Sequence, residues 1–186
     1  MILTYDDVSH LVTEQTELNE MFTVSRWDGP LVETALIVEY SELMAELEPL
    51  WKVRKPSQYR TSEAKVEFID CVHFMLSLLI IRSEKDVDGL NIKLNTDSSK
   101  TEGDFLVNVN SSFKMFLASE NSYPLSKLSF IQFVDHVTEF LKMDRETFFK
   151  YFETKKNINK ARVSGGYLEG TYCGKEAEAL QFSGIA

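Results

Sequence analysis

Apolar residues recur at three- and four-residue intervals over most of the chain, which is the spacing of amphipathic helices. The first such segment runs from about Tyr5 to Phe22, and Thr4 is placed to cap its start. Gly29-Pro30 then breaks the pattern, and Pro30 suits the first turn of a second helix that ends near Leu47. The prolines of segment 48–59 predict a loop after it.

The most apolar segment predicts a third helix, from about Ser62 to Arg82, capped by Thr61 or Ser62. It is apolar on nearly every side from Phe68 to Ile81, which indicates a fully buried helix. We expect further helices at 107–119 and 125–141 and a short one after Asp144, a polar insertion near 83–104, and a glycine-rich tail from Lys155. The pattern therefore predicts one all-α helical bundle over residues 1–186.

Composition agrees with a single helical domain. The 186 residues include only 8 glycines and 4 prolines, which favours helices over an all-β fold with many tight turns. The net charge of −9 argues against nucleic acid or an anionic membrane as the main partner.

The cysteines and the apolar runs bear on the compartment. Cys71 and Cys173 make no disulfide framework, which fits a reducing cytoplasm. The longest charge-free apolar run, Cys71 to Ile81, is shorter than the roughly 20 residues that span a bilayer. The first ten residues do not read as a signal peptide, so we expect a cytoplasmic protein without a membrane span.

Two pairs of acids interrupt the apolar pattern of consecutive helices. Glu39 and Glu42 are three residues apart and share a helix face, and Glu67 and Asp70 repeat this spacing inside the buried helix. A buried carboxylate without a partner costs several kcal/mol unless it is protonated or paired. Because Mg²⁺ prefers hard oxygen ligands, the four acids predict a divalent-cation site between the two helices.

Each acid pair alone is more typical of a solvated helix face, and it is their occurrence on consecutive helices that favours metal. Glu46 is expected to be solvated or to support the site, and His73 to be a core histidine with a backbone or carboxylate partner rather than a ligand. The chain has none of the motifs HExxH, CxxC, GxxxxGK[ST] and GxSxG, so zinc proteases, P-loop enzymes and serine hydrolases lose their usual support.

Bound cations would make a phosphate substrate acceptable to an acidic protein. The chain offers further positive charge in two places, namely Lys52, Arg54 and Lys55, and then Lys155, Lys156, Lys160 and Arg162. The second group is followed by Gly165-Gly166-Tyr167, where glycine lets backbone approach a phosphate and tyrosine can stack on a sugar or base. A flexible basic tail without such a role is an equally good interpretation of that segment alone.

Together these motifs resemble the dimeric, all-α, Mg²⁺-dependent dUTPases, relatives of the MazG-type nucleotide pyrophosphohydrolases. The resemblance rests on five segments in the family's order: Gln15-Thr16-Glu17-Leu18-Asn19, Glu39-Tyr40-Ser41-Glu42-Leu43, Trp51-Lys52, Glu67-Phe68-Ile69-Asp70 with His73-Phe74, and Lys155…Asn159-x-x-Arg162…Gly166-Tyr167.

The resemblance implies a cytoplasmic homodimer that hydrolyses dUTP to dUMP and pyrophosphate through a water activated by Mg²⁺, with Mn²⁺ as a substitute. It assigns the metal to Glu39, Glu42, Glu67 and Asp70, and Glu39 is also expected to orient the water. It implies that Gln15, Asn19 and Trp51 line the pyrimidine and sugar pocket, and that Lys52, Lys155, Asn159, Arg162 and Tyr167 bind or close over the phosphates and sugar.

The chain departs from the family's pattern at two places. Arg54-Lys55 replaces the second Trp-Lys pair, and the last motif is shortened to Gly174-Lys175-Glu176-Ala177-Glu178, without its Asp-Asn. Hydrolysis of dCTP, or of both nucleotides, therefore stays open, as does a non-catalytic helical regulatory dimer. The compact length fits a bacteriophage or bacterial member of the family.

Overall fold

The computed structural model describes residues 2–22, 28–50, 61–83 and 102–166, together with residues 170, 181–182 and 185. Over these residues the fold is helical without a strand, as predicted. Its elements are α1 (Tyr5–Met21), α2 (Gly29–Glu46), the 3-10 turn η1 (Glu48–Leu50), α3 (Thr61–Ser83), α4 (Glu102–Ala118), α5 (Tyr123–Phe140) and α6 (Arg145–Ser164).

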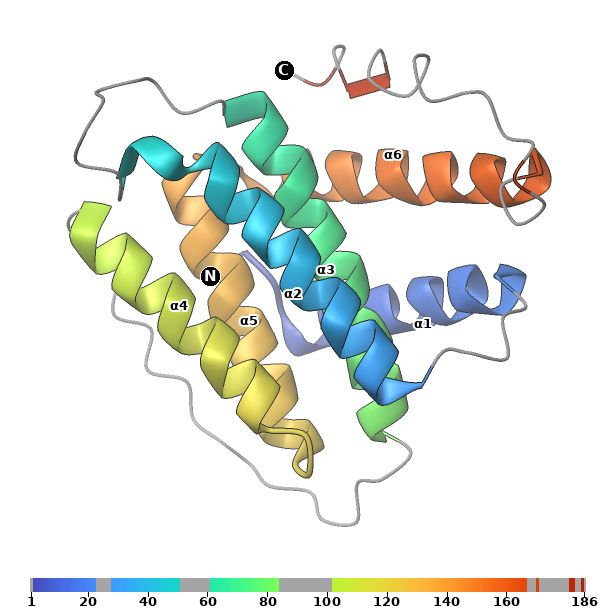
Figure 1. The fold of residues 1–186 in the computed structure, drawn as a ribbon, viewed down its shortest axis with the longest axis horizontal. Coiled ribbons are helices and arrows are strands. Elements are labelled where there is room, and N and C mark those ends of the chain that lie inside the picture. Colours follow the sequence, from blue (N-terminus) through green and yellow to red (C-terminus); the bar gives the residue numbers. More distant parts are fainter. Residues whose placement is uncertain are drawn as a thin grey trace.

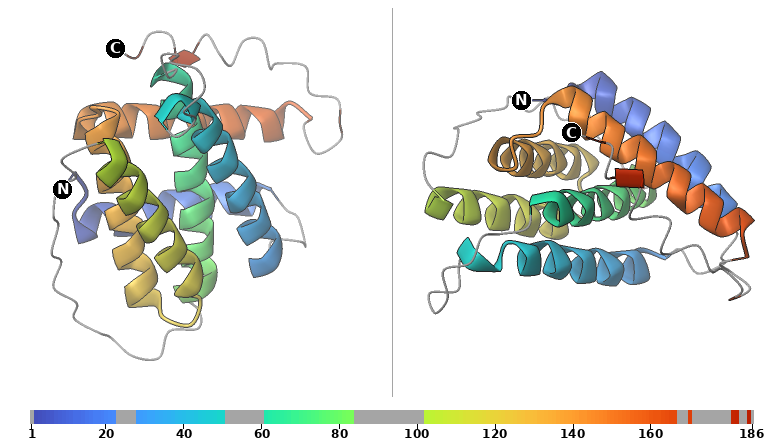
Figure 2. Two further views of the ribbon diagram at one scale, coloured as in Figure 1. Left: turned by 60° about the vertical axis from the view of Figure 1, so that its left-hand side comes forward. Right: turned by 90° about the horizontal axis from the view of Figure 1, so that it is seen from above.

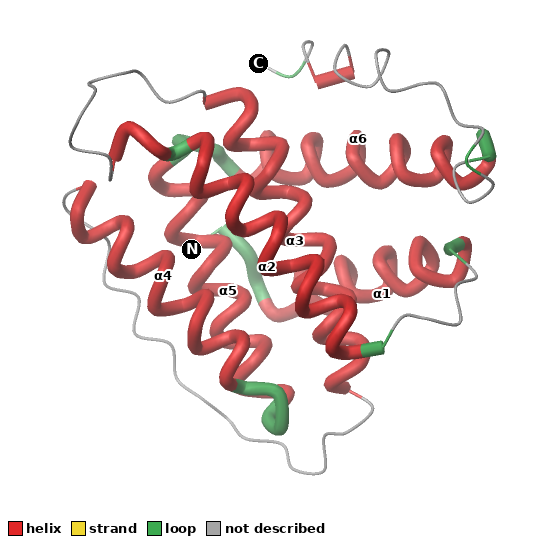
Figure 3. Tube along the Cα trace, viewed as in Figure 1, coloured by secondary structure: helices red, strands yellow, loops and turns green. Residues whose placement is uncertain are grey.

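Helix α3 is the centre of the bundle, and α1, α2, α5 and α6 all pack against it. Helix α2 lies along one side of α3, while α1 and α6 run side by side across its opposite side, nearly at right angles to it (Figures 1 and 2). Helices α4 and α5 form an antiparallel pair beside α2 and α3 (Figure 3). Consequently three helices, α2, α3 and α6, can bring side chains to one place.

The apolar pattern explains why α3 is central. Twelve of its residues are buried, among them the fully buried Phe68, Ile69 and Met75. They join a core rich in phenylalanine from the other helices, including Phe133 of α5 and Phe148 of α6. Among the described residues, no helix is long and apolar enough to cross a membrane.

Helix starts follow the local chemistry of the sequence. The Thr4 hydroxyl accepts a hydrogen bond from the Asp7 amide, and the Asp7 carboxylate accepts one from the Thr4 amide, so the two residues form a capping box. Asp28 caps α2, with Pro30 in its first turn, and Asp144 caps α6 by accepting from the Thr147 amide. The caps predicted at Thr4 and Asp144 are confirmed.

The last helix is the main correction to the predicted elements. It was expected to be short and to give way to a tail at Lys155, but α6 is 20 residues long and ends at Ser164. The helix continues because Phe148, Phe152 and Ile158 keep an apolar stripe facing the core, and no glycine interrupts it before Gly165. Helix α4 similarly begins at Glu102, inside the predicted insertion.

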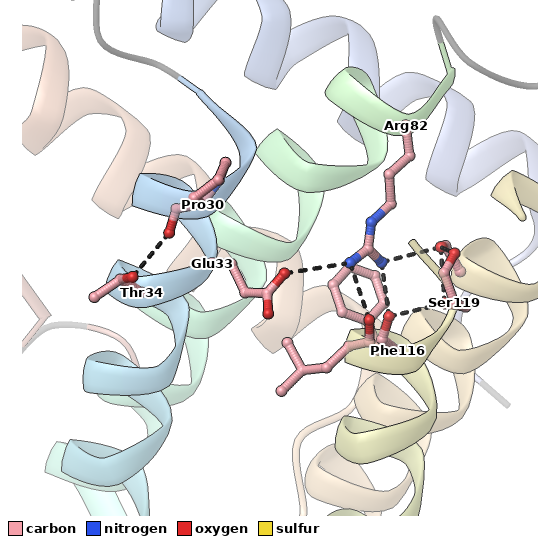
Figure 4. Close-up of polar contacts among 8 residues, drawn as sticks. Pro30, Glu33, Thr34, Arg82, Phe116 and Ser119 are labelled. Atoms are coloured by element: carbon pink, nitrogen blue, oxygen red, sulfur yellow. Dashed lines mark hydrogen bonds and ion pairs between the residues drawn. The ribbon is translucent and has the colours of Figure 1, made fainter. Parts of the chain in front are cut away.

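Arg82 is a buried cation near the end of α3 that links this helix to α2, α4 and α5 (Figure 4). Its Nη1 donates to the Phe116 carbonyl at 2.7 Å and to the Ser126 hydroxyl at 3.0 Å, and the guanidinium lies 4.6 Å from the centre of the Phe116 ring. A second nitrogen lies 4.0 Å from a Glu33 oxygen on α2. The side chain therefore satisfies carbonyls at the C-terminus of α4 that the helix itself leaves without partners.

We expect Arg82→Met to lower the free energy of unfolding by about 2–3 kcal/mol, measured by urea denaturation. Methionine keeps much of the apolar stem but removes the buried charged donor shared by the Phe116 carbonyl and the Ser126 hydroxyl. Arg145→Met is the matched control, because Arg145 also has an ion pair, with Asp7 at 2.6 Å, but its side chain is 59% exposed. The control should cost at most about 1 kcal/mol, and equal losses in the two variants would contradict the role given to Arg82.

Candidate active site

Three carboxylates from two helices meet where α2 packs along α3. One oxygen from each of Glu39, Glu67 and Asp70 lies within 4.8 Å of the other two. Glu67 and Asp70 are one turn apart on α3, and Glu39 faces them from α2. Three of the four predicted acids thus come together in space.

Glu42 lies at the edge of this group. It is exposed on α2, one turn after Glu39, and is not among the three acids whose oxygens approach most closely. Its charge nevertheless raises the pKa of both Glu39 and Glu67. Glu42 is therefore near enough to interact electrostatically with the group formed by the other three acids.

The acids of the group hold protons more tightly than ordinary carboxylic acids. Burial, followed by the charges of Asp70, Glu42 and Glu67, raises the pKa of Glu39 to about 7. Burial, followed by the charges of Asp70 and Glu42, likewise raises the pKa of Glu67 to about 7. Burial also raises the pKa of Asp70, against the opposing effect of Lys155.

Lys155 of α6 provides a positive charge to this group. Its Nζ donates to Asp70 Oδ2 at 2.6 Å, and its side chain is only 9% exposed. Arg162 lies two turns later on α6, and its charge favours the ionised form of Asp70. Asn159, between them on the same helix, accepts a hydrogen bond from Arg162 Nη1 at 3.3 Å. The face of α6 with these three side chains therefore borders the carboxylates.

This donor set fits a divalent cation. It offers hard oxygen ligands from three acids at close range, and among the described residues Asp70 is the member of the group with an ion-pair partner. Burial, and after it the charges of the neighbouring carboxylates, raises the pKa of Glu39 and Glu67, so their ionised forms are unfavourable without a further positive charge. A bound cation would supply that compensation.

A second polar cluster lies between α1 and α3. Gln15, buried on α1, contacts His73 and Ser77 of α3, and the half-buried Asn19 lies one turn further along α1. His73 is buried as expected, but its partner is the Gln15 amide rather than a backbone group or a carboxylate. Asp70, His73 and Ser77 are spaced three and four residues apart, so the cluster and the carboxylates share one face of α3.

One lysine expected to bind phosphate has other partners, and three predicted site residues are not described by the structure. Lys156, expected to add charge for a phosphate, forms ion pairs with Glu14 and Glu153 instead. Trp51, Lys52 and Tyr167 lie outside the described residues. Sequence analysis did not assign a role to Ser77, although its spacing from His73 was a usable signal.

Comparison with known proteins adds one finding to this geometry. A protein-family model described as dUTPase matches residues 7–167, a range that includes both acid pairs and the whole of α6. Searches of curated proteins and of solved structures gave no match.

Proposed function

Given that the chain belongs to the dUTPase family and hydrolyses dUTP to dUMP and pyrophosphate, we propose that Mg²⁺ held by its carboxylates supports this reaction. The observation that carries the proposal is the approach of Glu39, Glu67 and Asp70 to within 4.8 Å. Glu42 completes the set from the adjacent turn of α2, and Mn²⁺ is the expected substitute. When bound, the cation neutralises phosphate charge and lowers the pKa of water.

The chain's own residues have distinct tasks in this proposal. Glu39 orients the attacking water, because it faces the other two acids from a separate helix. Lys155 favours the ionised form of Asp70 and holds this side chain in place through their 2.6 Å contact. Arg162 offers a planar set of donors that matches phosphate oxygens, and Asn159 fixes the guanidinium by accepting from it.

The nucleoside end of the substrate is assigned to the other end of the shared α3 face. Gln15 and Asn19 lie there, beside His73 and Ser77. From Asp70 to Ser77 the helix advances about 10 Å, at 1.5 Å per residue. We assign Trp51 to the pyrimidine pocket, and Lys52 and Tyr167 to the phosphates and sugar, on the family pattern alone.

The proposal includes a homodimer in the cytoplasm. Large apolar side chains are exposed on α2 and α4, namely Leu31, Ile37, Val38, Val107 and Met115. These two helices lie on the same side of the bundle (Figure 1), where a second copy would cover them. A monomer in sedimentation velocity would contradict this part. The free, buried Cys71 is consistent with a reducing compartment.

The cation site is tested by the pH dependence of stability. In EDTA, we expect the melting temperature to fall as pH rises from about 4.5 to about 7, the ordinary and folded-state pKa of Glu39 and Glu67. Across this window the folded state binds more protons than the unfolded state, so raising the pH favours unfolding. Mg²⁺ should remove most of the fall, because it stabilises the ionised carboxylates.

The double variant Glu39→Gln with Glu67→Gln is the control for this measurement. It should lose both the fall in EDTA and the effect of Mg²⁺, because the amides neither titrate nor bind the cation strongly. A wild-type protein with the same melting curve in EDTA and in Mg²⁺ at pH 8 would contradict the proposed metal site.

A further inference from the structure

Four polar side chains between α1 and α3 form a chain of hydrogen bonds, which we call the relay. Its members are His73, Gln15, Asn19 and Ser77. His73 Nδ1 lies 2.6 Å from Gln15 Oε1. Gln15 Nε2 donates to Asn19 Oδ1 at 2.7 Å and to Ser77 Oγ at 3.2 Å. Ser77 Oγ also lies 3.2 Å from Asn19 Oδ1. Asn19 is thus the last residue of this chain of hydrogen bonds. The other three residues, His73, Gln15 and Ser77, are buried.

The tautomer of His73 determines which groups in the relay donate and which accept. An amide oxygen only accepts hydrogen bonds, so the contact with Gln15 Oε1 requires the hydrogen on His73 Nδ1. His73 Nε2 is buried without a hydrogen-bond partner among the described residues, and the ring stacks on Phe152 with 4.6 Å between ring centres. Burial lowers the pKa of His73 to about 3, so the ring is neutral and carries one hydrogen.

The hydrogen on His73 in turn determines how the Gln15 and Asn19 amides are oriented. Because Gln15 Oε1 accepts from His73, the Gln15 amide must turn its Nε2 toward Asn19. The Asn19 oxygen accepts that bond, so its Nδ2 group points the other way. No described residue accepts a hydrogen bond from Asn19 Nδ2, and the side chain is half-buried. The relay therefore presents an amide donor beside Ser77, about two turns along α3 from Asp70.

We propose that His73 is a positioning residue that, through Gln15, fixes Asn19 as a hydrogen-bond donor to the pyrimidine and thereby selects uracil over cytosine. Uracil has a carbonyl acceptor at position 4, where cytosine has an amino donor. A fixed donor on Asn19 pairs with the carbonyl of uracil but faces the amino donor of cytosine. Because a buried donor without an acceptor is costly, this arrangement discriminates strongly between the two bases. This inference rests on the proposed assignment of Asn19 to the base pocket.

Two substitutions of His73 separate the relay from simple packing. His73→Asn keeps a donor at the position of Nδ1 and loses the ring, whereas His73→Phe keeps the ring against Phe152 and loses the donor. The readout is the ratio of kcat/KM for dUTP to that for dCTP. We expect this ratio to fall by about tenfold or more in His73→Phe and to stay within about threefold of wild type in His73→Asn. A ratio lost in His73→Asn and kept in His73→Phe would overturn the proposal.

Binding of dUMP and dCMP, measured by calorimetry, tests the relay without hydrolysis. A wild-type preference for dUMP that His73→Phe abolishes supports the relay even where no turnover is found, so failure of the catalytic proposal is distinguishable from failure of this one. Equal wild-type affinity for dUMP and dCMP would overturn the relay and leave the metal site untouched.

The tautomer of His73 gives a test that needs no variant. The chain has three histidines, so ¹⁵N-histidine labelling gives a simple spectrum. We expect one ring that stays neutral down to about pH 5, with its hydrogen on Nδ1. A hydrogen on Nε2 of that ring would overturn the proposal, because the Gln15 amide would then have no reason to turn as described.

Discussion

Glu67→Gln is expected to lower kcat for dUTP by about 10³-fold or more while the helical fold persists. Glutamine has nearly the same volume and keeps one oxygen, so the packing of α3 against α2 should be unchanged. It removes one full negative charge from the group formed with Glu39 and Asp70. Loss of several kcal/mol of transition-state stabilisation corresponds to this fall in rate, since each 1.36 kcal/mol is about tenfold.

Glu63→Gln is the matched control for this substitution. Glu63 lies one turn earlier on α3, is exposed, and is outside the close carboxylate group. Its kcat should stay within about twofold of wild type, and circular dichroism should show both variants folded. Glu67→Gln with near wild-type turnover would remove the carboxylate group from the reaction.

Lys155→Met is the second substitution with a large expected effect. It removes the partner of Asp70 from a contact in which the two side chains are 9% and 15% exposed. Breaking a buried ion pair on one side typically costs about 3–5 kcal/mol, because the remaining charge has no compensation. We expect a loss of this size in the free energy of unfolding in EDTA, and a kcat/KM for dUTP lowered by about 10²-fold.

Mg²⁺ should restore part of the lost stability in Lys155→Met, since a cation beside Asp70 replaces the missing positive charge. Lys150→Met is the control, because Lys150 also forms an ion pair on α6, with Glu146 at 3.0 Å, but both side chains are more than half exposed. That change should cost less than about 0.5 kcal/mol. An equally small loss in Lys155→Met would show that the pair with Asp70 is not a buried one.

The sequence was sufficient to predict the parts of the fold that depend on local pattern. Periodic apolar positions predicted α1, α2 and α3 to within a residue or two at each end, and Thr4 and Asp144 were recognised as caps. The three-residue spacing of the acids predicted that they would share helix faces. The packing of α2 along α3 then brings Glu39 against Glu67 and Asp70.

Contacts between residues far apart in the sequence could not be predicted from local patterns. Lys155 and Asp70 are 85 positions apart, and their pairing depends on how α6 crosses α3. The length of α6 was underestimated because lysines at 155 and 156 look like a solvated tail, although both are buried. The bond between His73 and Gln15 joins residues 58 positions apart, and spacing within one helix could not reveal it.

Metal-dependent hydrolysis of dUTP is tested most directly by pyrophosphate release from each deoxynucleoside triphosphate separately, with Mg²⁺ and with EDTA. We predict turnover of dUTP in Mg²⁺, lost on chelation, with dCTP hydrolysed far more slowly. Turnover of dCTP at an equal rate would retain the carboxylate site and refute the selection of uracil. A folded protein that releases no pyrophosphate from dUTP in Mg²⁺ would contradict metal-dependent hydrolysis of dUTP by this chain.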